Sequence, residues 1–384
     1  MAVARRFKHG VVRYDREKAY EGYTLFWQTG TKDAWLIDML GRVVHRWRMP
    51  SNPGMDGVLL PNGNFLGSCQ TVNYVEAGLP PGFSGLGGLL LEVDWDGNEV
   101  WRCDTPYMSH AFYPLDNGNI IYIYWGPDLR LQGDAAARVK GGLPGTEHNG
   151  KYIWGESLIE INRQGERVWE WRASEHLDPD IDVMCLLEYR TQWPYTNSVF
   201  VMPDGNVLVS MRFINTVAIV DKRSGDIVWR WGPGELGHQH DARMIDNGNI
   251  LIFDNGAHRR TYGPSYSRVV EVNPKSNEIV WQYKANPPTD FYTATQGGEQ
   301  RLPNGNTLIC EALMGRLFEV TMEGELVWEF VNPIYGRQHH HGLVNSIFRA
   351  WRYGPDYPGL RGKELDPAKF YWTNEVYGRV VWNK

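Results

Sequence analysis

Short apolar runs alternate with polar turns along most of the chain, and the alternation follows two recurring patterns. The first pattern is an apolar run, an Asn-Gly or Asp-Gly pair, and a second apolar run. Asn-Gly and Asp-Gly favour two-residue type I′ turns, so each copy predicts a β-hairpin. The copies cover residues 58–66, 111–121, 198–208, 242–251 and 300–308.

The second pattern is an apolar strand, a short polar turn, and a Val-Trp strand with alternating polar residues. Its copies cover residues 90–103, 158–171, 217–231, 269–283 and 317–330, and a sixth copy at 36–47 has His45 in the tryptophan position. These stretches are again predicted hairpins. Because the tryptophans keep the spacing of the repeat, we expect them to pack between neighbouring units. They are Trp101, Trp169, Trp229, Trp281 and Trp328.

Alternating the two hairpins gives four strands per unit, which is the content of a β-propeller blade. The turn glycines of the first pattern are Gly63, Gly118, Gly205, Gly248 and Gly305, separated by 55, 87, 43 and 57 residues. A first-pattern strand at 345–353 lacks a following hairpin, and the hairpin at 36–47 lacks a preceding one. Pairing them removes exposed sheet edges. The sequence therefore predicts an all-β, six-bladed β-propeller of four-stranded antiparallel blades, a single domain over residues 1–384, closed by pairing N-terminal strands with the last blade.

Two insertions account for the long interval between Gly118 and Gly205. Residues 126–155 are rich in glycine and charge, and residues 172–194 carry a predicted short helix. Long loops on a rigid scaffold are commonly functional, so both are expected near the mouth of the propeller, as a lid or as surface decoration. Residues 355–384 form a C-terminal extension, in which a strand at 370–382 leaves a seventh blade as an alternative.

Composition and charge restrict the expected binding partners more than they restrict the fold. The 42 Gly, 22 Pro, 17 Trp, 20 Tyr and 13 Phe suit short strands and tight turns, and the formal net charge is −6. No run of Lys or Arg exceeds a pair, which argues against binding of nucleic acid or an anionic membrane surface. The four cysteines have no CxxC spacing, which argues against a metal knuckle or a dense disulfide framework. The N-terminus has no apolar segment of the kind found in secretion signals. We expect a small-molecule partner and a cytoplasmic location; the oligomeric state stays open.

Candidate chemistry appears when equivalent positions of the inner strands are compared. Eight residues before each turn glycine stand Met55, His110, Asn197, His240 and Gly297, and Asn345 takes this place in the closing blade. Two-residue hairpins would place Gln70, Trp125, Arg212, Asn255 and Ala312 opposite the first five. Buried polar side chains need partners, so this ring predicts a binding mouth at one end of the axis.

Several motifs around this ring resemble the bacterial arylsulfotransferase family. They are WPYTNS at 193–198, SMR at 210–212, GPG at 232–234, QHDA at 239–242, FDNG at 253–256 and SR at 267–268. The resemblance covers about residues 36–333. It implies a six-bladed propeller that passes a sulfuryl group from an aryl sulfate to a phenol through a sulfated histidine, without a cofactor.

Carried over residue by residue, the resemblance implies that His240 and Arg268 bind or polarise an anionic group, with Asn197, Arg212 and Asn255 nearby. Arginine suits this role because its planar guanidinium group can donate two parallel hydrogen bonds to a sulfate or carboxylate.

The chain departs from the family pattern at two places. Tyr195 stands where the third-blade motif of the family has a histidine, and residues 292–300, where the sulfated histidine would be sought, contain none. Without this nucleophile a two-step transfer loses its covalent intermediate. The scaffold and the anion site are therefore expected to carry over better than the two-step chemistry.

Three functions stay open at this point. The first is an arylsulfotransferase-like enzyme that acts on a small anionic, aromatic substrate at the central axis. For other reactions at the same site, His110 and His240 would serve as general acid and base, with Tyr195 as a proton donor or oxyanion stabiliser. Trp125 and Asn345 would be further substrate contacts.

The second function is a lyase or hydrolase on the same scaffold, using acid–base or metal-assisted chemistry. His110, His240 and His341, from the cluster at 339–341, would hold a divalent metal, and the spacing of His238 and His240 permits a chelate. The third is a non-catalytic propeller that binds a ligand or a protein. The same histidines would then be structural hydrogen-bond partners, and Arg268 would be a structural ion-pair partner.

Overall fold

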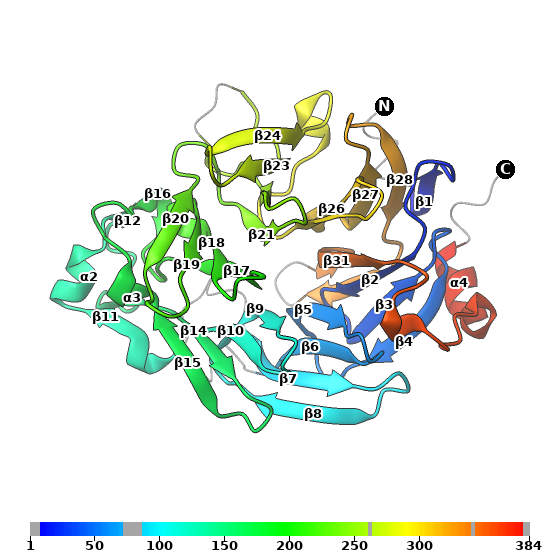
Figure 1. Cartoon of the computed structure of the whole chain (residues 1–384), viewed down its shortest axis with the longest axis horizontal. Helices are drawn as coiled ribbons and strands as arrows, with labels where there is room; N and C mark the ends of the chain where they lie inside the picture. Colours follow the sequence, from blue (N-terminus) through cyan, green and yellow to red (C-terminus); the bar gives the residue numbers. More distant parts are fainter. Residues whose placement is uncertain (1–7, 72–86, 260–262, 339–341, 379–384) are drawn as a thin grey trace.

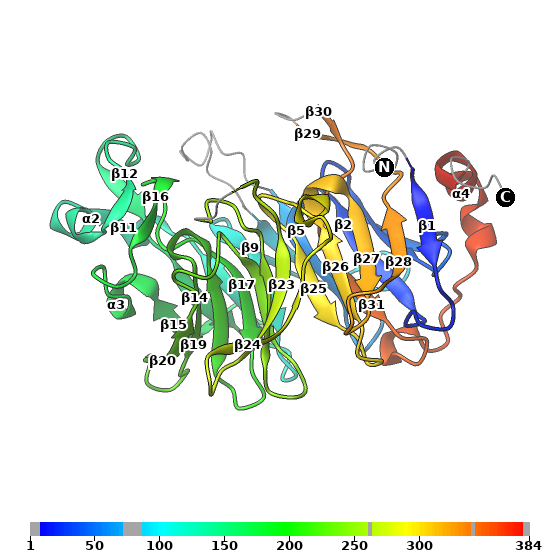
Figure 2. The ribbon, with the colours of Figure 1, turned by 90° about the horizontal axis from the view of Figure 1, so that it is seen from above.

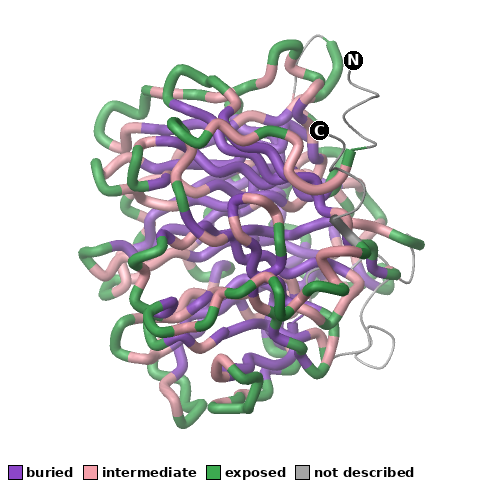
Figure 3. The backbone as a smooth tube through the Cα atoms, turned by 90° about the vertical axis from the view of Figure 1, so that its right-hand side faces the viewer, coloured by how far each residue is buried: buried purple, intermediate pink, exposed green. Residues whose placement is uncertain are grey.

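A computed structural model of the protein describes residues 8–71, 87–259, 263–338 and 342–378. Six antiparallel sheets stand around a common axis as a six-bladed β-propeller (Figure 1). The buried backbone lies in the strands, and the exposed segments lie mainly at the turns (Figure 3). The predicted all-β propeller is confirmed.

The strands of blades 1 to 5 follow the chain from the axis outward. Blade 1 consists of β5 (Pro53–Leu59), β6 (Phe65–Gln70), β7 (Gly88–Val93) and β8 (Glu99–Asp104); blade 2 of β9 (Met108–Pro114), β10 (Ile120–Tyr124), β14 (Ser157–Ile161) and β15 (Arg167–Arg172). Blade 3 consists of β17 (Thr196–Val201), β18 (Val207–Met211), β19 (Thr216–Val220) and β20 (Ile227–Trp231); blade 4 of β21 (His240–Met244), β22 (Ile250–Asp254), β23 (Arg268–Asn273) and β24 (Glu278–Tyr283). Blade 5 consists of β25 (Gly298–Arg301), β26 (Thr307–Glu311), β27 (Arg316–Val320) and β28 (Leu326–Val331).

Blade 6 closes the ring with strands from both ends of the chain. Its inner strand is β31 (Ile347–Tyr353), and its outer three are β2 (Tyr23–Gln28), β3 (Asp33–Ile37) and β4 (Val43–Arg48). The predicted closure is therefore confirmed. A further N-terminal strand, β1 (Gly10–Tyr14), was not predicted and pairs with β28 at the outer edge of blade 5.

The C-terminal extension does not add a seventh blade. Its described part contains the 3₁₀ turns η5 (Pro358–Leu360) and η6 (Pro367–Phe370) and the helix α4 (Tyr371–Gly378). The strand expected at 370–382 is thus wrong where the structure describes it. No helix among the described residues has the length and apolar character needed to cross a membrane.

The Asn-Gly and Asp-Gly turns are three-residue loops, not the two-residue type I′ turns expected from the sequence. In blade 3, Val201 pairs with Val207. The Met202 N–H bonds to the Asn206 carbonyl at 2.8 Å, and the Gly205 N–H bonds to the Met202 carbonyl at 2.9 Å. Gly205 has φ +87°, the left-handed conformation that such a loop requires at its third residue. The cross-strand pairing is consequently displaced by one position beside the turn, and beyond the bulge in blade 4 His240 pairs with Phe253 instead of the predicted Asn255.

The repeated tryptophans link neighbouring blades, as predicted. The indole N–H of Trp101 donates to the carbonyl of Arg163 at 2.7 Å, and that of Trp169 donates to the carbonyl of Lys222 at 2.9 Å. The Arg163 guanidinium lies over the Trp101 ring. Because each Trp bonds to the turn of the next blade, the spacing of the repeat fixes how the blades pack.

The two insertions form one module beside blades 2 and 3. The first contains η1 (Pro127–Leu129), β11 (Arg130–Gln132), α2 (Asp134–Arg138), β12 (Gly141–Leu143) and β13 (Tyr152–Trp154); the second contains α3 (Ala173–His176) and β16 (Met184–Tyr189). Strand β12 pairs with β16, and the Arg190 guanidinium bonds to the carbonyls of Ala136, Val139 and Gly141. The module rises on the same side of the ring as the hairpin β29 (Gly336–Gln338) and β30 (Gly342–Val344) (Figure 2). The predicted short helix is α3.

Candidate functional site

Five inner strands, those of blades 1, 2, 3, 4 and 6, carry β-bulges or similar register shifts at the same end of the axis. Pairing shifts between Thr196 and Ser198 in blade 3 and between His240 and Ala242 in blade 4. In blade 6 the pairing of β31 with β2 shifts between Phe26 and Gln28. A bulge bends the strand and redirects the extra side chain. The extra residues of blades 3 and 4 are Asn197 and Asp241, and Asp241 has the uncommon φ of +42°.

A buried charge cluster lies where these strands converge, and we call it the axial cluster. It contains Asp56, Asp241, Arg243, Glu299 and Arg349, from blades 1, 4, 5 and 6. Arg349 Nη1 donates to Asp56 Oδ2 at 2.6 Å, and Arg349 Nε lies 3.0 Å from Asp241 Oδ2. Arg243 Nε lies 3.2 Å from Asp241 Oδ1. One guanidinium thus joins carboxylates from two other blades.

Glu299 is the third acidic residue of the axial cluster. Its side chain is buried, and neither carboxyl oxygen has a hydrogen-bond partner within the described residues. Burial, followed by the charge of Asp241, raises the pKa of Glu299 well above its usual range. Burial therefore favours the protonated form of Glu299.

His240 is held as a single neutral tautomer beside this cluster. Asn255 Nδ2 donates to the carbonyls of Thr293 and Gln296 at 2.8 and 2.7 Å, which leaves its Oδ1 as the acceptor for His240 Nδ1 at 2.8 Å. The Gln296 N–H donates to His240 Nε2 at 3.2 Å. Nδ1 therefore carries the proton. Burial lowers the pKa of His240 well below its usual value, and the charge of Arg212 adds to this.

Aromatic rings form a wall next to His240. Tyr195 stacks on Phe213 with ring centroids 4.7 Å apart, and His110 packs edge-on against Phe348 at 5.0 Å. The His110 and Tyr195 rings are 6.4 Å apart. We call His110, Tyr195, Arg212, His240 and Asn255 the mouth cluster. All five were predicted site residues.

Arg212 belongs to the mouth cluster but starts the 3₁₀ turn η2 (Arg212–Ile214), so it does not pair across the hairpin with Asn197 as predicted. Its guanidinium lies over Phe213 at 5.3 Å, and Nη1 donates to Glu188 Oε1 at 3.0 Å. Nε is buried and has no hydrogen-bond partner in the described part of the chain. Glu188 comes from strand β16 of the insertion module.

Three other predicted site residues have structural partners. The Trp125 indole donates to Glu156 Oε2 at 3.1 Å. Arg268 Nε donates to Asp254 Oδ2 at 2.8 Å, which is the ion-pair alternative considered for it. Asn345 Nδ2 donates to the carbonyl of Asn332 at 3.0 Å.

Asn197 is also buried and partly satisfied. Its Nδ2 donates to the carbonyl of Gln239 at 2.7 Å, whereas Oδ1 has no partner among the described residues.

The metal site predicted from His110, His240 and His341 is not assembled by the described residues. Both ring nitrogens of His240 are engaged, by Asn255 and by Gln296. His341 lies outside the described residues. The predicted chelate of His238 and His240 does not form either, because His238 faces Glu188 and His258 instead. A metal held by His341 stays a prediction.

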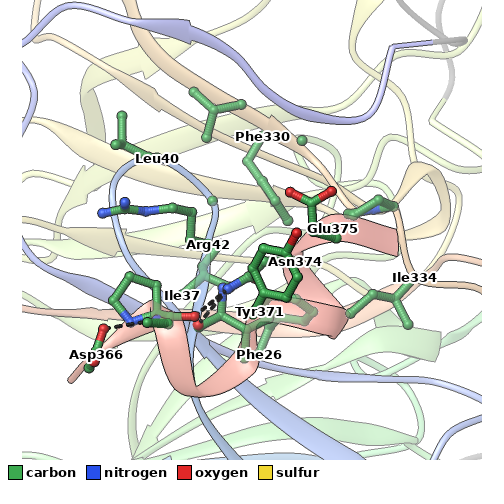
Figure 4. Close-up of a pocket in the computed structure, with 17 residues that line it drawn as sticks. Phe26, Ile37, Leu40, Arg42, Phe330, Ile334, Asp366, Tyr371, Asn374 and Glu375 are labelled. Atoms are coloured by element: carbon green, nitrogen blue, oxygen red, sulfur yellow. Dashed lines mark hydrogen bonds between the residues drawn. The ribbon is translucent and has the colours of Figure 1, made fainter. Parts of the chain in front are cut away.

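Two cavities lie away from the axis. One of about 640 Å³ lies at the outer rim, between blades 5 and 6 and helix α4, lined by Phe26, Phe330 and Tyr371 among others (Figure 4). Another of about 490 Å³ is lined by Tyr292, Glu311, Arg316, Glu329 and Asn345 among others. Arg316 is paired with both Glu311 and Glu329 in that cavity, so the acids outnumber the bases and an anion is disfavoured there.

Sequence reasoning missed the axial cluster, although one signal was present. Asp56 and Asp241 both stand seven residues before a turn glycine, one position beyond the ring that was compared. Glu188 had no such signal, because it lies in an insertion outside the repeat.

Similarity to other proteins extends over most of the chain. Residues 72–333 match the model of the family described as Arylsulfotransferase (ASST). A search of curated proteins found no match. A protein of unknown function from Bacteroides caccae is similar over 86% of this chain and 98% of its own, with a TM-score of 0.56 and 16% identity, which supports the fold alone. Hydrazine synthase from Kuenenia stuttgartiensis is similar over 79% of this chain and 78% of its own, with a TM-score of 0.46 and 12% identity.

Proposed function

Because the chain belongs to the arylsulfotransferase (ASST) family, we propose that it is an enzyme that binds a small aryl sulfate at the propeller axis and transfers the sulfuryl group to a phenol. The mouth cluster and the axial cluster together form the site.

The observation that carries the proposal is a pair of guanidinium groups with unused donors next to His240. Arg212 Nε and Arg349 Nη2 are buried and have no hydrogen-bond partner within the described residues. A buried donor without an acceptor is costly, by about 1–3 kcal/mol each. The oxygens of a bound sulfate would satisfy both donors, and charge-assisted bonds to sulfate are the strong ones.

The aromatic wall accounts for the other half of the substrate. Tyr195, Phe213 and Phe348 are buried rings, of which Tyr195 stacks on Phe213 and Phe348 packs against His110. An aryl group packed against them gains about 0.5–1.5 kcal/mol per ring pair beyond its buried area. The site therefore suits an aromatic compound with one anionic group.

The proposed reaction is a direct transfer. Residues 292–300 contain no histidine. In the same segment, the backbone N–H of Gln296 occupies His240 Nε2. The acceptor phenol oxygen forms a bond to sulfur while the bond from sulfur to the donor aryl oxygen breaks. His110 takes the proton of the acceptor phenol, and the Tyr195 hydroxyl gives a proton to the departing aryl oxygen.

His240 acts as a positioning residue in this proposal. Its neutral ring adds no charge beside the sulfate, and its bond to Asn255 holds the segment that carries Gln296.

The test is release of p-nitrophenol from p-nitrophenyl sulfate, with and without added phenol. Wild type is expected to release p-nitrophenol only with phenol. Arg212→Gln should lower kcat/KM on the order of 10- to 100-fold, since a hydrogen bond to a charged group contributes about 1.5–3 kcal/mol. Arg163→Gln is the matched control, because Arg163 also pairs with a buried glutamate, Glu92, but at the interface of blades 1 and 2. Folded wild type that releases nothing would reject the proposal.

A second candidate is a hydrolase or lyase at the same axis, which the raised pKa of Glu299 favours. A buried neutral carboxylic acid next to a carboxylate is a common arrangement for a general acid. The same assay separates the two functions, because hydrolysis releases p-nitrophenol without phenol and Glu299→Gln would abolish it.

A further inference from the structure

A cysteine and two histidines meet beside the mouth cluster, and none of them has a role in the proposed transfer. Cys185 lies on β16 of the insertion module, His238 precedes β21, and His258 follows β22. One ligand atom from each lies within 4.8 Å of the other two. Three segments that are far apart in the sequence thus bring a thiol and two imidazoles to one point.

The separations fit the edges of a tetrahedral metal site. Cys185 Sγ is 3.6 Å from His258 Nδ1, and the two imidazole centroids are 4.4 Å apart. Zinc bonds of about 2.3 Å to sulfur and 2.0–2.1 Å to nitrogen, at tetrahedral angles, place the two ligand atoms about 3.6 Å apart. Cys185 Sγ and His258 Nδ1 are therefore at the separation expected of two ligands of one ion.

His238 supplies the independent sign that something is bound. Its side chain is fully buried, and Nε2 has no hydrogen-bond partner among the described residues. Nδ1 lies 3.0 Å from Glu188 Oε1. Buried polar groups are nearly always satisfied, so an imidazole of this kind needs a further partner.

Glu188 lies beside the three ligands. Its Oε1 is 3.0 Å from His238 Nδ1 and 3.9 Å from His258 Nδ1, and it also accepts from Arg212 Nη1. The donors for the ion are one thiolate and two imidazoles. Thiolate and imidazole select zinc-type ions over magnesium or calcium.

We propose that Cys185, His238 and His258 bind a divalent metal ion of the zinc type. This site differs from the metal site predicted at His110, His240 and His341, and it does not rest on the proposed sulfuryl transfer. The ion would tie the insertion module to blade 4 at the edge of the mouth. Binding releases the proton of the Cys185 thiol, because the thiolate is the ligand.

Cobalt(II) titration of the full chain, free of tags and stripped with a chelator, tests the proposal. Wild type is expected to take up one ion per chain and to show the thiolate-to-cobalt charge-transfer band. Cys185→Ser should lose that band. Cys103→Ser is the matched control, because Cys103 is also partly buried but lies on β8 of blade 1, and it should keep the band.

A second variant separates the ligand role from folding. The His258 ring is about one-third exposed, so His258→Ala should fold, which far-UV circular dichroism checks. It should weaken cobalt binding more than about 100-fold, since loss of an outer-shell partner alone weakens binding 10- to 100-fold. The variant H339A/H340A/H341A should bind like wild type. Folded wild type without stoichiometric uptake, or a Cys185→Ser protein with the wild-type band, would overturn the proposal.

Discussion

Arg349 is the side chain that joins three blades at the axis, and replacing it with methionine is expected to destabilise the ring. It extends from β31 of blade 6 to Asp56 in blade 1 and Asp241 in blade 4, at 2.6 and 3.0 Å. Methionine keeps much of the alkyl stem and removes the charge. The variant therefore leaves two buried carboxylates without their shared cation.

The structure sets the size of the effect. The side chains of Arg349, Asp56 and Asp241 are 2%, 3% and 1% exposed, so water cannot replace the missing partner. Removing one member of a buried ion pair costs about 3–5 kcal/mol. That is a large share of the roughly 5–15 kcal/mol that stabilises a typical domain. Lys369→Met, which breaks the exposed pair with Glu364, should cost at most about 1 kcal/mol.

Urea unfolding followed by tryptophan fluorescence measures both variants, and its pH dependence adds a second check. Burial raises the pKa of Asp56, and Arg349 opposes that rise. Without Arg349 the pKa rises further. The deficit in unfolding free energy should then be largest above the raised pKa and shrink as the pH falls toward about 3.9, the unfolded-state pKa of aspartate. A loss below about 1 kcal/mol at pH 7, or a deficit independent of pH, would refute the reasoning.

Three further outcomes follow from the same contacts. Asn255→Ala removes the acceptor of the His240 Nδ1 proton and should lower the free energy of unfolding in urea by about 1–3 kcal/mol; an unchanged value would mean that this bond contributes nothing. Because burial raises the pKa of Glu299 in the folded protein, wild-type stability should fall as the pH rises above about 4.3 toward the raised pKa, whereas Glu299→Gln should not show this loss; parallel pH profiles from urea unfolding would contradict the upward shift. Arg190→Met should expose residues 126–155 to limited proteolysis before the blades, and cleavage at the wild-type rate would show that Arg190 does not hold the insertion module.

The blades could be predicted because each repeats its chemistry. Gly205 and its four equivalents have positive φ in the hairpin loops, so they mark the hairpins in the sequence. Trp101 and its equivalents mark the interfaces between blades. Strand β1 could not be predicted, because it pairs with blade 5 through backbone groups and its sequence matches neither pattern.

The site was predicted only in part because bulges in the inner strands shift the pairing from that of a regular hairpin. His240 and Asn255 were assigned as cross-strand partners, yet His240 pairs with Phe253 and the two side chains meet only because the strand bulges. The same bulge directs Asp241 toward Arg349. A bulge changes which face each later side chain occupies, and no residue type in these strands marks its position.

Turnover of p-nitrophenyl sulfate in the presence and absence of phenol, measured for wild type and Arg212→Gln, tests the proposed function most directly. We predict phenol-dependent release of p-nitrophenol by wild type and a 10- to 100-fold lower kcat/KM in the variant, on the order expected for one charge-assisted contact to the sulfate. Release that is absent from folded wild type, or equal in the two proteins, would contradict an aryl sulfate site at the axis.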